Sequence, residues 1–302
     1  MKTEKKTGRV MALGFFDGVH LGHGTLLRRV ADLAGARGLE ASALTLDRHP
    51  TALLGVDPAP LLNSLEDRIY LIRRYYGIDN TLVLPFDEQL KRMPWERFLE
   101  DCLIGTYGAA HLVAGHDYRF GYQGQGTTVR LQEACAARGI GCDIIPAVER
   151  EGRTVSSTYI RTLVLAGEME RAAEFLGHPH LMSGKVERGK SLGHTIGFPT
   201  VNLRFAPGVL VPRHGGYITR VYLENGESYP AVTNVGVRPT VEQDGAVNVE
   251  GHLLNFKGDL YGQSLRMEFC RYLRPEQKFD SLEALQEEIR RNAEETAAYF
   301  KP

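Results

Sequence analysis

The stretch "GFFDGVHLGHGTLL", residues 14–27, decides how the first half of the chain is read. The apolar run before it, "RVMALGF" at 9–15, predicts a strand, and "HGTLLRRVADLAGARG" at 23–38 predicts a helix. Its glycines let backbone N–H groups approach phosphate oxygens, and a helix start favours negative charge. His20 and His23 stand three apart at this helix start. Phosphate binding, packing and metal ligation all stay open here, although no Cys, Asp or Glu follows at a familiar metal-site spacing.

The composition indicates a soluble globular protein that is long enough for two domains. The chain has 302 residues, of which 43% are hydrophobic, and a formal net charge of -1. This charge gives no bulk attraction to nucleic acid or anionic membrane, so we predict neither as a partner. The basic N-terminus precedes an apolar run that is too short for a signal peptide, and no run approaches the roughly 20 apolar residues of a membrane span. Four cysteines without a CxxC pair favour a cytoplasmic location.

The first half alternates short β-rich runs with longer amphipathic runs, which predicts βαβ units and a parallel sheet covered on both faces. The expected strands are 9–15, 40–46, 80–86, 110–115 and 142–148, and the expected helices are 23–38, 64–77, 94–108 and 129–139. The segment at 156–177 closes this half with two short helices joined at Ala166 and Gly167.

The rhythm changes near Gly177. Short β-rich runs separated by turn residues follow, at 181–189, 215–224, 227–236, 247–256 and 264–273, and an amphipathic run occupies 281–300. This pattern predicts an antiparallel sheet or small barrel capped by a helix. We therefore expect two domains, 1–180 and 181–302.

Three further segments of the first half are weak signals when each is taken alone. His49 in "TLDRHP" at 45–50 is typical of a turn, and "GHDYRFG" at 115–121 is typical of a surface loop with an ion pair. "VSSTYIR" at 155–161 is typical of a helix cap whose early N–H groups and arginine can hold a phosphate. Together these segments follow successive strands and share phosphate-binding chemistry.

The motifs in their order resemble a known family. "GFFDGVHLGH" with "SSTYIR" resembles the HxGH-type nucleotidyltransferases. With "GHDYRFG", "GKSLGHTIGFPTVNL", "TNVGVRPTV", "VEGHLLNFKGDLYG" and "RPEQKFDSLEAL", the chain is similar to bacterial bifunctional riboflavin kinase/FMN adenylyltransferases over residues 9–300. The resemblance implies an N-terminal Rossmann-like parallel α/β nucleotidyltransferase domain. It also implies a small antiparallel β-barrel riboflavin kinase domain with a C-terminal helix.

For the first domain, the resemblance implies an adenylyl group passing directly from ATP to a phosphate acceptor. His20 and His23 would be catalytic and hold the ATP phosphates, and Asp17 would support the turn before them. The implied nucleotide- and phosphate-binding residues are Gly14, Gly22, Ser156, Ser157, Thr158 and Arg161. The implied flavin-binding residues are His49, Asp117 and Phe120.

For the second domain, the resemblance implies a metal site, a phosphate loop and a base. Thr200 and Asn202 would hold the Mg²⁺ of the bound ATP, and residues two apart on a strand do project to one face. Glu250 would remove the proton from the riboflavin 5′-hydroxyl. The phosphate loop would contribute Gly189, Lys190 and Gly193. The implied substrates and products are riboflavin, FMN, FAD, ATP, ADP and pyrophosphate, with Mg²⁺ as cofactor.

The chain departs from the family pattern at three places. His194 stands where arginine is common, the loop 122–128 carries no basic residue, and Asn255 stands where aspartate is common. Two alternatives therefore accompany the two-activity enzyme: a chain that keeps one activity, and a flavin- or nucleotide-responsive binding protein on the same scaffold. The presence of His20, His23 and Glu250 favours the enzyme with both activities.

Overall fold

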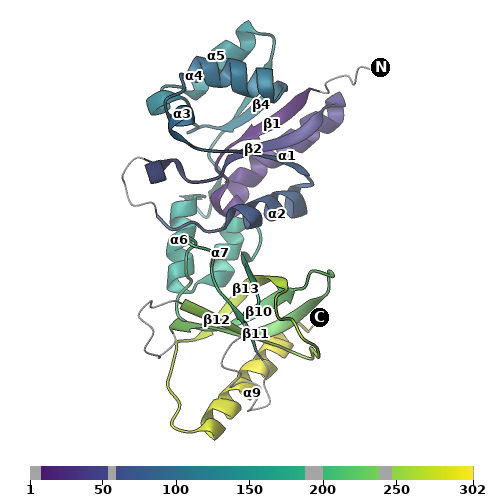
Figure 1. The fold of residues 1–302 in the computed structure, drawn as a ribbon, viewed down its shortest axis with the longest axis vertical. Helices are drawn as coiled ribbons and strands as arrows, with labels where there is room; N and C mark the ends of the chain where they lie inside the picture. The colour runs from purple at the N-terminus through teal and green to yellow at the C-terminus, as the bar shows by residue number, and fades with distance from the viewer. Residues whose placement is uncertain (1–7, 54–58, 188–199, 238–246, 302) are drawn as a thin grey trace. The chain divides into compact units, whose positions relative to one another are not determined.

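The computed structural model describes residues 8–53, 59–187, 200–237 and 247–301. The chain divides into two compact units, each described by itself below (Figure 1). The first unit comprises Met1–Ala59 and Arg68–Ser156, and the second comprises Pro60–Asp67 and Ser157–Pro302. The predicted domain boundary at residue 180 stays a prediction. The two short helices that precede it group with the second unit.

A five-stranded sheet forms the centre of the first unit, in the order β3-β2-β1-β4-β5 and parallel throughout. Its strands are β1 (Arg9–Leu13), β2 (Glu40–Leu46), β3 (Asn80–Leu84), β4 (Ala109–Gly115) and β5 (Gly141–Ile145). The helices between them are α1 (Leu21–Arg37), α2 (Leu65–Tyr76), α3 (Glu88–Lys91), α4 (Trp95–Arg97) with the π-type segment Phe98–Thr106, and α5 (Thr128–Ala137). The predicted parallel α/β fold is confirmed. A short exposed hairpin of β6 (Glu149–Arg150) and β7 (Arg153–Thr154) was not predicted.

The strand order creates a switch point between β1 and β4. From β1 the chain builds outward through β2 to β3, and then returns to add β4 on the other side of β1. Loops that leave two strands at such a point diverge beyond their carboxyl ends, and open α/β sheets bind ligands there. The glycine-rich stretch follows β1 and "GHDYRFG" follows β4, so the topology brings these two motifs to one edge.

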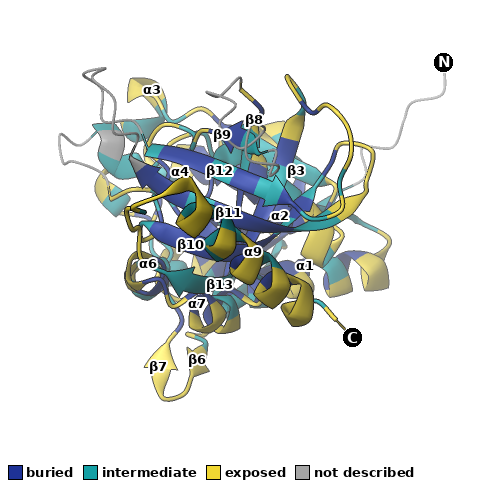
Figure 2. Cartoon of the chain, turned by 90° about the horizontal axis from the view of Figure 1, so that it is seen from below, coloured by how far each residue is buried: buried dark blue, intermediate teal, exposed yellow. Residues whose placement is uncertain are grey.

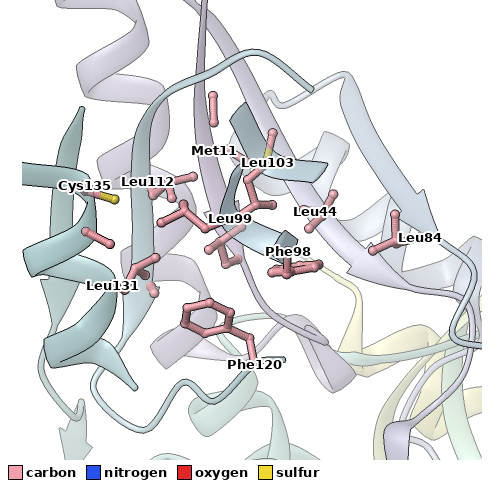
Figure 3. Close-up of a cluster of buried hydrophobic side chains, with 14 residues drawn as sticks. Met11, Leu44, Leu84, Phe98, Leu99, Leu103, Leu112, Phe120, Leu131 and Cys135 are labelled. Atoms are coloured by element: carbon pink, nitrogen blue, oxygen red, sulfur yellow. The ribbon is translucent and has the colours of Figure 1, made fainter. Parts of the chain in front are cut away.

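Apolar side chains from the strands and from the segment before β4 form the core on one side of this sheet (Figure 3). Met11, Leu44 and Leu112 come from the sheet, and Phe98 and Leu99 come from the π-type segment. These side chains have at most 5% of their surface exposed. Burial of apolar surface contributes about 25 cal/mol per Å² and is the dominant favourable contribution to folding, so this core stabilises the sheet.

A six-stranded antiparallel sheet forms the second unit, in the order β8-β13-β10-β11-β12-β9. Its strands are β8 (His180–Lys185), β9 (Val201–Leu203), β10 (Gly215–Tyr222), β11 (Ser228–Val237), β12 (Val247–Leu253) and β13 (Ser264–Arg274). Its helices are α6 (Ser157–Ala166), α7 (Met169–Leu176) and α9 (Leu282–Tyr299). The N–H of Glu187, after β8, donates to the Asn202 carbonyl at 2.9 Å, which joins the two edges and curls the sheet into the predicted barrel.

The two faces of this sheet have different roles, because side chains alternate along each strand. Along β12, Val249 and Leu253 are buried, whereas Glu250 and His252 are only partly covered. Helix α9 packs against β11 and β10 and keeps its outer side exposed (Figure 2). Ser281 caps α9 by accepting from the Ala284 N–H at 3.1 Å. No helix in the described part of the chain is both long and apolar enough to cross a membrane.

His180 makes the second unit sensitive to acid. It is fully buried, and neither ring nitrogen has a hydrogen-bond partner among the described residues. Burial first, and His178 second, lower the pKa of His180 to about 3. The unfolded chain takes up this proton near pH 6.5. The free energy of unfolding therefore falls as the pH falls from about 6.5, where the unfolded chain takes up the proton, towards about 3, where the folded unit does.

His180→Phe should remove this sensitivity, because phenylalanine fills the ring volume beside Phe269 without a titrating group. Between pH 7 and pH 5, the parent should lose about 2 kcal/mol more unfolding free energy than the variant. Urea unfolding, monitored by pulsed hydrogen exchange of the β8 and β13 amides, measures the difference. An equal loss in the two proteins would show that His180 is already protonated in the folded unit.

Candidate active sites

The turn between β1 and α1 is strained. Phe16 and Val19 have φ values of 59° and 44°, a region that side chains rarely adopt and that is least favourable for a β-branched residue. Asp17, between them, is only 3% exposed. Strain of this kind costs about 1–3 kcal/mol per residue and persists only where surrounding contacts hold it. The turn ends at His20, so its conformation sets where this side chain lies.

His20 and His23 form a stacked pair at the start of α1. His20 is the N-cap, and its Nδ1 accepts the His23 N–H at 3.3 Å. The two ring centroids are 3.6 Å apart with 13° between the planes, and the His23 ring meets Phe16 edge-on at 5.3 Å. Because His20 Nδ1 is an acceptor, the proton of its neutral ring is on Nε2. The structure therefore brings the two predicted catalytic histidines together and fixes the tautomer of one.

His23 is neutral at neutral pH. Burial lowers its pKa well below the usual value, and the nearby His20 and Arg68 lower it further. His23 thus offers one N–H donor without a full charge, and its Nδ1 has no hydrogen-bond partner in the described residues. No group of three or more His, Cys, Asp or Glu side chains that could hold a metal occurs in the part of the chain described. The pair can donate hydrogen bonds to an oxyanion.

The predicted flavin-binding residues occupy different environments at the ends of β2 and β4. His49 is half-buried, meets the Phe15 ring edge-on at 4.9 Å, and shares a 2.6 Å hydrogen bond with the Thr51 hydroxyl. Asp117 is exposed just after β4. Phe120, in contrast, is 6% exposed and packs in the core with Phe98 (Figure 3). Its role in flavin binding stays a prediction, and its evident role here is packing.

The predicted phosphate-binding residues also differ. The N–H of Gly14 donates to the Leu44 carbonyl at 3.2 Å, so this glycine contributes space for the Phe16 ring and not a free donor. Val155, which directly precedes Ser156, lies beside the start of α1. A Cβ added at Gly22 would be 3.9 Å from the Val155 carbonyl oxygen. Ser157, Thr158 and Arg161 lie in α6 of the second unit, where Arg161 Nε donates to the Pro60 carbonyl at 2.8 Å.

Gly22→Ala tests whether the position of the His20 ring matters. The added Cβ would lie 3.1 Å from Cε1 and Nδ1 of His20, so the ring must move by a few tenths of an ångström. Misplacements of this order at reacting groups lower rates steeply, and we expect about a 10-fold loss in adenylyl transfer to FMN. Gly35→Ala is the matched control, because it lies on the same helix with nothing within 4 Å. Equal rates for the two variants would exclude this effect.

The second candidate site lies on the outer face of the antiparallel sheet. Glu250 on β12 pairs in register with Asn202 on β9 and with Asn234 on β11. Asn248, two residues before Glu250, donates from Nδ2 to Glu250 Oε1 at 2.6 Å and to Asn202 Oδ1 at 3.3 Å. One amide thus holds the predicted base and one predicted metal ligand on the same face.

The other residues predicted for this site are placed only in part. Thr200 is half-buried and immediately precedes β9. Gly189, Lys190 and Gly193, and the departure His194, lie outside the described residues. Asn255 has a φ of 61°, in the left-handed region that asparagine and aspartate both tolerate better than most residues.

Two structural partners of the sites were missed from the sequence. Arg68 lies three and four residues before the buried Leu71 and Ile72, so it is on the apolar face of α2. This helical spacing could have indicated from the sequence that Arg68 is buried. Asn248 lies two residues before Glu250 on the same face, but an asparagine in a strand gives no signal of its own.

Comparisons with known proteins match both halves of the chain. The sequence model of FAD synthetase matches residues 2–159, and that of riboflavin kinase matches residues 176–300. A Bacillus subtilis protein is 33% identical over 301 residues, covering 98% of this chain and 94% of its own. A Pseudomonas fluorescens protein is 36% identical over 296 residues, covering 96% and 92%. Both relatives are named bifunctional riboflavin kinase/FMN adenylyltransferase.

A solved structure also matches over nearly the whole chain. It is a crystal structure from Streptococcus pneumoniae described as a macrolide-efflux protein. Its TM-score is 0.84 at 28% identity, covering 98% of this chain and 96% of that one. The similarity supports the arrangement of elements described above within each unit.

Proposed function

Because the chain belongs to the family of bifunctional riboflavin kinases/FMN adenylyltransferases, we propose that it catalyses two successive ATP-dependent reactions. The first converts riboflavin and ATP to FMN and ADP. The second converts FMN and ATP to FAD and pyrophosphate. The observation that carries the proposal is that each unit holds its own predicted catalytic groups, the stacked histidines in one and the Asn202–Glu250 pair in the other. We place both reactions in the cytoplasm, in keeping with the four free cysteines.

In adenylyl transfer, a phosphate oxygen of FMN attacks the α-phosphorus of ATP, and pyrophosphate leaves. Negative charge grows on the non-bridging oxygens of the α-phosphate during this step. The Nε2–H of His20 and the single N–H of the neutral His23 can donate hydrogen bonds to those oxygens. Ser156 is a further phosphate ligand in this proposal, and the N-terminus of α1 favours the same charge.

In phosphorylation, Glu250 accepts the proton of the riboflavin 5′-hydroxyl, and the resulting oxygen attacks the γ-phosphorus of ATP. Asn248 keeps the carboxylate in place through its 2.6 Å hydrogen bond. Thr200 and Asn202 would hold the metal, since their hydroxyl and amide oxygens are suitable neutral ligands for Mg²⁺ bound with ATP. The metal would supply neutralisation of phosphate charge. The remaining catalysis is positioning of the hydroxyl by the chain.

Mg²⁺ should bind the kinase site only together with nucleotide. Asn202 Oδ1 already accepts from Asn248, and two neutral oxygens cannot replace the water ligands that Mg²⁺ holds tightly. Calorimetry on the full chain should give no Mg²⁺ binding without ADP, whereas Asn202→Asp should add nucleotide-free binding. Tight Mg²⁺ binding by the parent without nucleotide would contradict this coordination.

Chromatography of the products made from riboflavin, ATP and Mg²⁺ tests the proposed function. The parent should accumulate FMN and then FAD. FMN without any FAD would support the alternative that one activity was kept. Flavin binding without turnover would support the alternative of a flavin-responsive binding protein.

A further inference from the structure

Arg68 is a fully buried charged side chain in the first unit, and neither proposed reaction step uses it. Its exposed fraction is 0%, and it ranks among the largest of the fully buried side chains. Burial lowers the pKa of Arg68 to about 10, while Asp17 and Asp47 act in the opposite direction. The guanidinium is therefore charged at neutral pH. A buried charge is costly unless its contacts compensate, so those contacts indicate what it does.

The contacts of Arg68 join the carboxyl ends of β1 and β2. Nη1 donates to the Phe15 carbonyl at 2.5 Å and to the Thr45 hydroxyl at 3.1 Å, and Nη2 donates to the Leu46 carbonyl at 3.2 Å. The Thr45 hydroxyl itself donates to the Phe15 carbonyl at 2.9 Å. The guanidinium carbon also lies 4.1 Å from the centre of the Phe15 ring. These bonds fix the points at which the two strands pass into their loops.

The loop after β1 needs such an anchor. Phe15 is the last residue before the turn in which Phe16 and Val19 are strained, and this turn leads directly to His20. A relaxed turn would move the N-cap and separate the stacked imidazole rings. The Phe15 ring that lies beside the Arg68 guanidinium also meets the His49 ring edge-on, so one guanidinium supports residues of two predicted site loops.

Arg68 also acts on His23 through its charge. The charged or titratable groups that act on His23 are His20 and Arg68, and both disfavour its protonation. Asp17 and Asp47 face Arg68, and Arg48 pairs with Asp47 at 3.1 Å. Arg68 is fully buried, so its charge cannot move into solvent by a change of side-chain rotamer. It supplies a fixed positive charge that acts on His23.

We propose that Arg68 is a positioning residue for adenylyl transfer, which rests on the proposed function. Its guanidinium holds the turn that carries His20 in the conformation needed for the stacked pair. Its charge adds to burial and to His20 in disfavouring protonation of His23. The phosphate-binding histidines thus depend on a residue that touches no substrate.

Two substitutions separate the two effects, and a third is the control. Arg68→Met removes the charge and the donors at similar length, whereas Arg68→Lys keeps the charge but loses the planar fork. Arg73→Met makes the same change on the same helix at a side chain that is 72% exposed. For each full-length protein, the measurements are kcat and KM for FAD formation, the rate of FMN formation, and the ring NMR titration of His23.

Arg68→Met should lower kcat for FAD formation about 100-fold and raise the pKa of His23, with FMN formation retained. Arg68→Lys should lower kcat while the His23 pKa stays low, and Arg73→Met should match the parent. Parent-like kcat in Arg68→Met, an unmoved His23 titration, or equal loss of both activities would overturn the proposal. If Arg68→Met does not fold, parent-like kcat in a folded Arg68→Lys overturns it. Should the parent make no FAD, the proposed function fails, and the NMR titration still tests the charge.

Discussion

Glu250→Gln is expected to lower the rate of riboflavin phosphorylation about 100- to 10,000-fold, the range for loss of a general base. The substitution is conservative in shape. Glutamine keeps an oxygen that can accept the Asn248 hydrogen bond, so the row of side chains across β9 and β12 should survive. What disappears is the carboxylate that takes the proton of the 5′-hydroxyl. Steady-state rates of FMN formation measure the loss.

The same protein contains the control for this variant. Adenylylation of added FMN should continue at the parent rate, because His20, His23 and Ser156, which are proposed for it, lie in the first unit. Glu283→Gln, an exposed change on α9, should leave both reactions unaltered. A Glu250→Gln enzyme that still phosphorylates riboflavin within a few-fold of the parent would assign the base to another group. Loss of both activities would indicate damage to the fold.

His23→Ala is expected to have the reciprocal effect, with FAD formation about 100- to 1000-fold slower and FMN formation nearly unchanged. Removing one preorganised donor at a developing oxyanion costs this much in rate. The alanine also leaves the His20 ring without its 3.6 Å stacking partner. With riboflavin as substrate the variant should therefore accumulate FMN, which chromatography detects directly.

The pH dependence distinguishes this role from that of a charged histidine. The pKa of His23 is well below the usual value, so the ring is already uncharged at pH 7. Deprotonation of His23 should therefore not lower kcat between pH 7 and pH 8. Thr25→Ala, two positions along α1, is the control and should keep the parent profile. A loss of activity over this range that disappears in His23→Asn would show that the imidazolium is the active form.

Much of the fold could be predicted from the sequence because the relevant signals are local. The strand and helix periods placed all five strands of the first unit near their observed positions. Turn residues marked the longer strands of the second unit, whereas the three-residue β9 was not among the predicted runs. The HLGH spacing likewise placed both histidines at the start of α1, where three residues span less than one helical turn. Local geometry sufficed in each of these cases.

Strand order and buried electrostatics could not be predicted in this way. Periodicity shows that β1 and β4 are strands, but the pairing that makes them neighbours joins residues about 100 positions apart, such as Val10 and His111. Asn248 gained its role only when register placed Asn202 opposite Glu250. Phe120 was predicted to bind flavin, and its packing against Phe98 became visible only in the folded core.

The sequence by itself therefore determined which residues are proposed to carry the chemistry and in what kind of element each one stands. The tertiary structure alone decided their ionisation, tautomer and support. His23 is neutral because folding buries it near His20 and Arg68, and no local spacing encodes that desolvation. Arg68 reads as an ordinary helix residue until α2 places it against the ends of β1 and β2, where long-range hydrogen bonds keep the charge buried.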